Sequence, residues 1–219
     1  MQWYLRKYFI LTLALTAFLL MPSFFDQSKG TTLIEVLFFL LMLSTLYSVV
    51  HNRYLLILGI TLTVISQWGT LTTSQSANLG YIAGLVSALL LLLIVIIVIL
   101  RNIISTDEIQ VDTIFGGIAT YLLIGVAWAL VYYITDTLIP QAFIINAEFP
   151  VQSMVLTGKS DFGFYNYFSM VTMTSLGYGD IIPAHPVTRA LATYQVVVGQ
   201  MFIAILVARL VGLHLVKSG

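Results

Sequence analysis

Residues 170–180 form the stretch whose composition best suits direct contact with a small ion. The order is Met-Val-Thr-Met-Thr-Ser-Leu-Gly-Tyr-Gly-Asp, so Gly177 and Gly179 alternate with larger residues. Glycine takes positive φ at little cost, and the backbone from Ser175 to Gly179 can therefore alternate its conformation and point successive carbonyls the same way. Several such segments facing one another would form a tube of oxygens, an arrangement that can replace the hydration shell of a cation.

A short helix is expected to position this stretch. Asp161 is the predicted N-cap of a helix over about residues 162–174, which is roughly 20 Å long at 1.5 Å per residue. The hydrocarbon core is about 30 Å thick, so this helix must enter the membrane and stop inside it. Such a re-entrant segment is tolerated only where protein or water surrounds it. Its negative dipole end would face the central cavity and favour a cation there.

The stretch from Thr174 to Asp180 resembles the potassium-channel signature, whose usual form is Thr-Thr-Val-Gly-Tyr-Gly-Asp. A short helical run precedes it and a membrane-length apolar run follows it, so the likeness is more specific than a GxG pattern. The resemblance extends over about residues 112–216, half the chain. It includes Arg189 after the filter and Gly199 at the usual position of a hinge glycine.

The resemblance implies roles for individual residues. The potassium ligands would be the backbone carbonyls of Ser175, Leu176, Gly177 and Tyr178, together with the side-chain hydroxyl of Ser175. Thr174, Gly179 and Asp180 would support the filter. Tyr167 replaces one of the family's paired tryptophans, and its hydroxyl is predicted to reach Asp180 and brace the filter.

Two residues depart from the signature. Ser175 keeps the hydroxyl of the usual threonine but lacks the methyl that restricts its rotamer. Leu176 replaces valine and adds bulk behind the filter. Neither change removes an oxygen ligand. With both changes present, however, a pore that admits cations in general remains an alternative to a potassium-selective one.

The composition is that of an integral membrane protein. Of 219 residues, 59% are hydrophobic and 8% are charged, whereas soluble domains carry about 25% charged residues. The formal net charge is zero, which argues against nucleic-acid binding. The chain contains no cysteine, which excludes disulfides and thiol chemistry.

Hydropathy predicts an all-α membrane protein with six transmembrane helices and one re-entrant pore helix with its filter. The expected spans are residues 8–21, 33–50, 54–68, 79–100, 114–133 and 187–216. Of the nine basic residues, six fall on one side of this topology and three on the other. The positive-inside rule therefore places both termini in the cytoplasm of a multi-pass cell-membrane protein.

Three regions are expected. Residues 1–104 would form a four-helix peripheral domain, 105–113 a cytoplasmic linker and 114–219 the pore domain. The fourth span matches a voltage-sensing helix in position but carries only Arg101, at its end. Each charge that crosses the field contributes only about 2.3 kcal/mol per 100 mV, so strong voltage sensing is not expected.

The last span contains three candidate gating residues. Gly199 is predicted to act as a hinge or as a close-packing site. Gln200 is interpreted as the only amide in the middle of this helix, and it is expected to face water or a neighbouring helix. Arg209 either snorkels to the interface or pairs with Asp107, Glu108 or Asp112 and couples the linker to the gate.

The sequence as a whole favours a homotetrameric, potassium-selective channel that conducts passively and is not an enzyme. Its expected partners are potassium ions, the lipid bilayer and three further copies, with no cofactor. A non-selective cation channel is the first alternative. A transporter subunit with a re-entrant loop is the second, although the paired broken helices typical of transporters are not evident.

Overall fold

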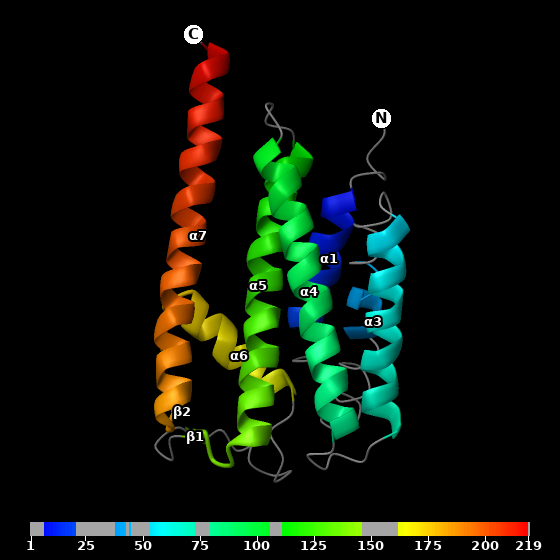
Figure 1. Ribbon diagram of the computed structural model, residues 1–219. Helices are drawn as coiled ribbons and strands as arrows, with labels where there is room; N and C mark the ends of the chain where they lie inside the picture. Colours follow the sequence, from blue (N-terminus) through cyan, green and yellow to red (C-terminus); the bar gives the residue numbers. More distant parts are fainter. Residues whose placement is uncertain are drawn as a thin grey trace.

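The computed structural model describes residues 7–20, 38–42, 44, 53–72, 79–105, 111–145 and 162–218. Its long helices stand side by side, and one short helix crosses between two of them (Figure 1). The helices are α1 (Lys7–Leu20), α3 (Arg53–Thr72), α4 (Leu79–Ser105), α5 (Val111–Leu138), α6 (Phe162–Met173) and α7 (Pro186–Ser218). Two short strands, β1 (Phe143–Ile145) and β2 (Ile181–Pro183), complete the described elements.

Three of the described helices are long and apolar enough to cross a membrane. They are α4, α5 and the segment Pro186–Gly212 of α7, and α1 is a shorter apolar helix. The span predicted at 33–50 and the N-cap predicted at Asp161 fall largely or wholly outside the described residues. The described part of the chain is therefore a helical membrane protein, and the count of six spans stays a prediction.

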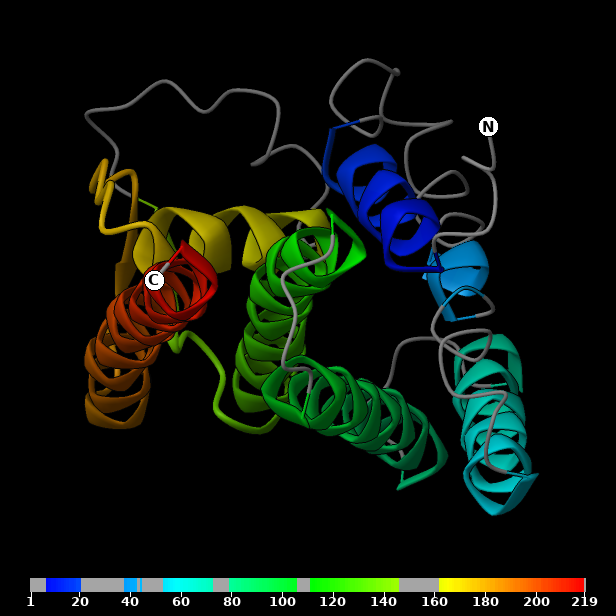
Figure 2. The ribbon, with the colours of Figure 1, turned by 90° about the horizontal axis from the view of Figure 1, so that it is seen from above.

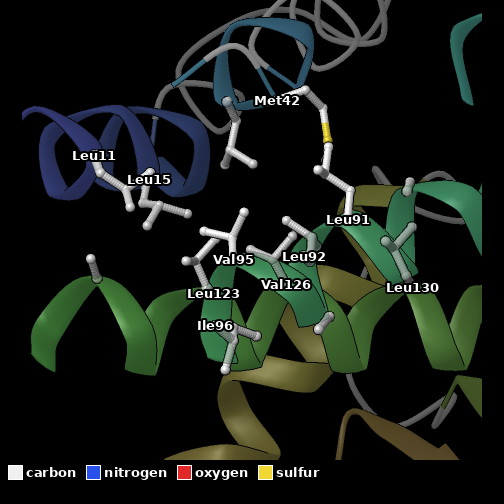
Figure 3. Packing of buried hydrophobic residues seen from close by; sticks show 14 of the residues in the cluster. Leu11, Leu15, Met42, Leu91, Leu92, Val95, Ile96, Leu123, Val126 and Leu130 are labelled. Atoms are coloured by element: carbon white, nitrogen blue, oxygen red, sulfur yellow. The ribbon is translucent and has the colours of Figure 1, made fainter. Parts of the chain in front are cut away.

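Helix α5 is the central element. Viewed from above, α7 and α3 lie at opposite edges of the molecule with α5 between them (Figure 2). One side of α5 packs against α1 and α4 through fully buried aliphatic side chains, which meet in a single layer (Figure 3). This layer includes Leu11, Leu15, Leu92, Val95, Leu123 and Val126. The other side of α5 packs against α6 and α7.

Glycines allow the contact between α3 and α4 to be unusually close. A Cβ added at Gly69 of α3 would lie 2.6 Å from the carbonyl oxygen of Gly80 in α4. A Cβ at Gly84 would lie 3.1 Å from the Cα of Gly69. Small residues let membrane helices approach through their backbones, so α3 is fitted to α4 at this crossing.

The element boundaries differ from the sequence prediction at the linker. Helix α4 continues to Ser105 and α5 already begins at Val111, so helical structure enters both ends of the predicted 105–113 linker. Residues 106–110 lie outside the description. Apolar periodicity locates the buried part of a helix, but hydrogen bonding carries the helix on into its polar ends.

The all-helical prediction also omitted a small sheet. Strands β1 and β2 pair antiparallel, with Ile144 opposite Ile182. The amides of Ala184 and His185 extend this link, because both donate to the carbonyl of Ala142. The segment after α5 is thereby joined to the segment that follows the filter.

Candidate functional site

Helix α6 carries the candidate site at its C-terminal end. It runs obliquely between α5 and α7 and ends beside the middle of α7 (Figure 1). Its 12 residues correspond to about 18 Å, which is less than the thickness of the hydrocarbon core. A short helix is therefore present where the sequence predicted one, and it ends at Met173, one residue before the expected end; that it re-enters the membrane stays a prediction.

The backbone after α6 alternates in handedness. Ser175, Gly177 and Gly179 all have positive φ, of 60°, 59° and 79°, while Leu176 and Tyr178 between them do not. For a non-glycine residue such as Ser175 this conformation is strained. Alternation of this kind turns successive peptide planes so that their carbonyls can share one side.

Hydrogen bonds show toward which side of this segment the backbone N–H groups point. The N–H of Leu176 donates to the carbonyl of Val171 at 3.0 Å, and the N–H of Gly177 reaches the same oxygen at 3.4 Å. The N–H of Ser175 donates to the carbonyl of Thr172 at 3.0 Å. These three N–H groups therefore cap the last turn of α6, where unpaired helix carbonyls require donors.

The other side of this segment is open. Residues 174–179 are all exposed, and a Cβ added at Gly177 or Gly179 would meet nothing within 4 Å. Even the large side chains of Leu176 and Tyr178 are 54% and 59% exposed. Exposed backbone is costly in lipid, so this open face requires water, ions or protein against it.

The predicted brace between Tyr167 and Asp180 is present as a contact. The Tyr167 hydroxyl donates to Asp180 Oδ2 at 2.6 Å, and Asp180 Oδ1 accepts from the N–H of Ile181 at 3.0 Å. The part of this contact in filter stability remains a prediction.

A buried polar network lies directly behind this segment. Gln195 of α7 donates through Nε2 to Ser169 Oγ at 2.7 Å and to the Ser169 carbonyl at 3.1 Å. Ser169 Oγ in turn donates to the carbonyl of Gly125 at 2.7 Å, and the Tyr132 hydroxyl donates to Gln195 Oε1 at 2.6 Å. Ser169, Gln195 and Tyr132 are each 0% exposed. Helices α5, α6 and α7 are joined here by directed bonds.

Sequence reasoning missed this network. The prediction that Gln200 is the only amide in the middle of its helix is wrong, because Gln195 lies five residues earlier in α7. The available signal was an amide among apolar residues of a membrane span, since a polar side chain there faces protein or water. Periodicity alone does not show which buried serine and tyrosine it meets.

Gly199 is a site of close helix packing. A Cβ at this position would lie 2.8 Å from the carbonyl oxygen of Met173, the last residue of α6. That neighbour is backbone, which cannot move aside easily. Of the two predicted roles, hinge or close packing, the contact supports the second.

The two other gating candidates contact quite different elements. Gln200 Nε2 donates to Ser175 Oγ at 3.0 Å, so it reaches the first residue of the filter segment. Arg209 Nη2 donates to the carbonyls of Ile103 and Ile104 at 2.9 and 2.6 Å. Of the acidic partners that one of the two predictions named for Arg209, Asp107 and Glu108 lie outside the described residues, and that pairing stays a prediction. A cation at the C-terminal end of α4 also complements the helix dipole.

Acidic side chains at the opposite end of the molecule serve the fold. Asp136 accepts from the Tyr165 hydroxyl at 2.5 Å and from the N–H of Ala142 at 3.1 Å. It therefore fixes the turn between α5 and β1. Within the described ranges, no group of three or more His, Cys, Asp or Glu residues could hold a metal ion.

Comparison with known proteins adds one match. Residues 120–213 match the family described as "Ion channel". No curated protein matches the chain, and no solved structure matches it. The matched residues include α6, the alternating segment and most of α7, and the match supports an ion channel function in a membrane.

Proposed function

We propose that the chain is a potassium-selective channel subunit that conducts passively as a homotetramer in the cell membrane. The alternating backbone of residues 175–179 carries this proposal. The amides of Ser175, Leu176 and Gly177 turn back to Thr172 and Val171, and we infer that the carbonyls of Ser175, Leu176, Gly177 and Tyr178 face the open side. Carbonyl oxygens arranged in rings replace the hydration shell of a potassium ion.

Several copies are required to complete such a ring. One chain supplies one filter segment, and that segment is exposed along its whole length. Only 17% of the most apolar window of α7 is buried, compared with 50% in α4 and 56% in α5. A closed cyclic assembly would cover these surfaces, and four-fold symmetry is what the resemblance to potassium channels implies.

The surroundings of the filter suit a cation. The C-terminal end of α6 directs its negative dipole toward the inner end of the filter segment. Asp180, held by Tyr167, contributes a carboxylate at the outer end. No arginine lies within α4 before Arg101, so the proposed channel is not strongly voltage-gated.

Flux measurements on purified protein in liposomes test the proposal. We expect potassium flux that is blocked by barium and exceeds sodium flux by at least roughly tenfold, which corresponds to about 1.4 kcal/mol of discrimination. Absence of ion flux from correctly reconstituted tetramers would contradict the proposal.

A non-selective cation channel is the second candidate, because of the inner end of the filter. Ser175 lacks the methyl of the usual threonine, and its hydroxyl oxygen already accepts a bond from Gln200. Equal potassium and sodium flux in the same liposomes would favour this candidate.

A further inference from the structure

The inner end of the filter segment contains a contact that its signature does not require. The side-chain amide of Gln200 donates to Ser175 Oγ at 3.0 Å, across the exposed face of the segment. Its neighbour Thr174 is occupied elsewhere, because its hydroxyl donates to the carbonyls of Met170 and Val171. At this end of the segment, the Thr174 hydroxyl is therefore held by α6 and the Ser175 hydroxyl is held by α7.

The position of Gln200 is well defined by its neighbours. Gly199 lies against the carbonyl of Met173 so closely that a Cβ would approach it to 2.8 Å. Gln195, five residues earlier, is tied to Ser169 of the same helix α6. Helix α7 is thus fixed to α6 by two contacts just before Gln200, and the amide is held at the level of Ser175.

The chemistry of the Gln200 amide and the Ser175 hydroxyl determines how the hydrogen bond affects cation binding. An amide nitrogen is only a donor, so the bond consumes one of the two lone pairs of Ser175 Oγ. Without a γ-methyl, serine has more rotamer freedom than threonine, and the bond to Gln200 selects one rotamer. The amide hydrogens also carry partial positive charge, which disfavours a cation close by.

We propose that Gln200 is a specificity-determining residue, which holds the Ser175 hydroxyl and competes with a cation for it, weakening the innermost cation site. This inference rests on the proposed potassium-channel function. Serine replaces the threonine of the signature at position 175, and the inference gives this serine a partner on α7. Ser175 and Gln200 would therefore act as a pair.

Barium block from the side of the α7 C-terminus is the test, because barium is a divalent cation close to potassium in size. In Gln200→Leu, which is similar in shape but donates no hydrogen bond, we expect at least a fivefold tighter block. Gln200→Asn, which is one methylene shorter and cannot reach Ser175, should change block in the same direction. In a Ser175→Ala background, Gln200→Leu should alter block less than twofold, since coupled residues are non-additive.

Met201→Leu is the matched control, because Met201 is the next residue of α7 and is 56% exposed. It should leave block unchanged. Unchanged or weaker block in Gln200→Leu and Gln200→Asn, with potassium-selective flux retained, would overturn this inference and leave the proposed function standing. Absence of selective potassium flux in the unmodified protein would overturn both.

Discussion

The two sides of helix α5 are built differently. Toward α1 and α4 the middle of the interface consists of aliphatic side chains such as Leu92, Val95 and Leu123 (Figure 3). Polar links on this side lie near the two ends of α5, where Thr12 donates to the carbonyl of Phe115 and Tyr81 bonds to Tyr133. Toward α6 and α7, a buried polar network joins Gly125, in the middle of α5, and Tyr132 to Ser169 and Gln195.

This difference shows which part of the molecule needs exact placement. Lipid tails are as apolar as leucine, so aliphatic packing in a membrane does little to fix the orientation of a helix. A buried hydrogen bond is lost if its partners shift by about 1 Å. The polar network therefore fixes α6, and with it the filter, whereas the peripheral helices are held by packing that tolerates adjustment.

The largest expected effect comes from the filter backbone. Positive φ costs alanine about 1 kcal/mol relative to glycine. In Gly177→Ala, relief of this strain would rotate a peptide and remove a carbonyl from the ion path. We expect potassium flux in liposomes to fall more than roughly tenfold.

Gly80→Ala is the matched control for this substitution. Gly80 also has open space around its Cβ position, but it lies in α4 and has no positive φ. Flux should be unchanged there. Equal loss in both variants would mean that the conformation of the filter segment is not what conduction requires.

The next effect concerns the contact between α7 and α6. A methyl at Gly199 would press on the backbone carbonyl of Met173, and overpacking of this kind costs about 1–3 kcal/mol. We expect Gly199→Ala to lower both the thermal stability of the protein and its potassium flux, by roughly fivefold for flux.

Gly117→Ala provides the comparison, because its Cβ would meet the flexible side chain of Leu206 at a similar 2.8 Å. Leu206 can turn aside, so this variant should lose less than half as much stability. If flux rises in Gly199→Ala while stability is kept, close packing is not the role of this glycine.

A paired substitution tests the two sides of α5 against each other. Gln195→Leu removes the centre of the polar network, and interhelical hydrogen bonds in membranes contribute about 0.6–1.7 kcal/mol. Leu92→Ala, at a fully buried aliphatic position, costs about 2–5 kcal/mol. We expect Gln195→Leu to reduce the ratio of potassium to sodium flux and Leu92→Ala to leave the ratio unchanged despite its greater loss of stability.

Melting curves and flux ratios measured on the same preparations give both quantities. A fall in selectivity with Leu92→Ala equal to that with Gln195→Leu would remove the distinction between the two sides.

The smallest expected effect is at the outer end of the filter. Tyr167→Phe deletes the bond to Asp180, which contributes about 0.5–1.5 kcal/mol. Single-channel recordings should show a several-fold faster loss of conduction during sustained opening. Tyr194→Phe, at a tyrosine that is 62% exposed, should behave like the unmodified protein. If Tyr167→Phe does the same, the brace does not stabilise the filter.

The sequence predicted the parts of this arrangement that depend on local chemistry. Composition and hydropathy gave the membrane class, and helix length predicted that the segment starting at Phe162 would stop inside the bilayer. The alternation at Gly177 and Gly179 followed from glycine's freedom at positive φ. The hydroxyl of Tyr167 was expected near Asp180, where it lies.

Contacts between distant parts of the chain were not predictable in the same way. Gln195 meets Ser169 and Tyr132 because α6 crosses between α5 and α7 at one particular angle, which no periodicity specifies. Arg209 reaches the backbone of α4, and main-chain carbonyls leave no mark in a sequence. The pairing of β1 with β2 involves only three residues on each side, too few for a strand pattern.

The most direct test of the central claim is an experimental structure of the assembled protein with thallium in place of potassium. We expect four copies around one axis, with anomalous density for thallium on that axis at the level of the carbonyls of residues 175–178. A filter segment turned toward lipid, or an axis without ion density at this level, would contradict the channel proposal.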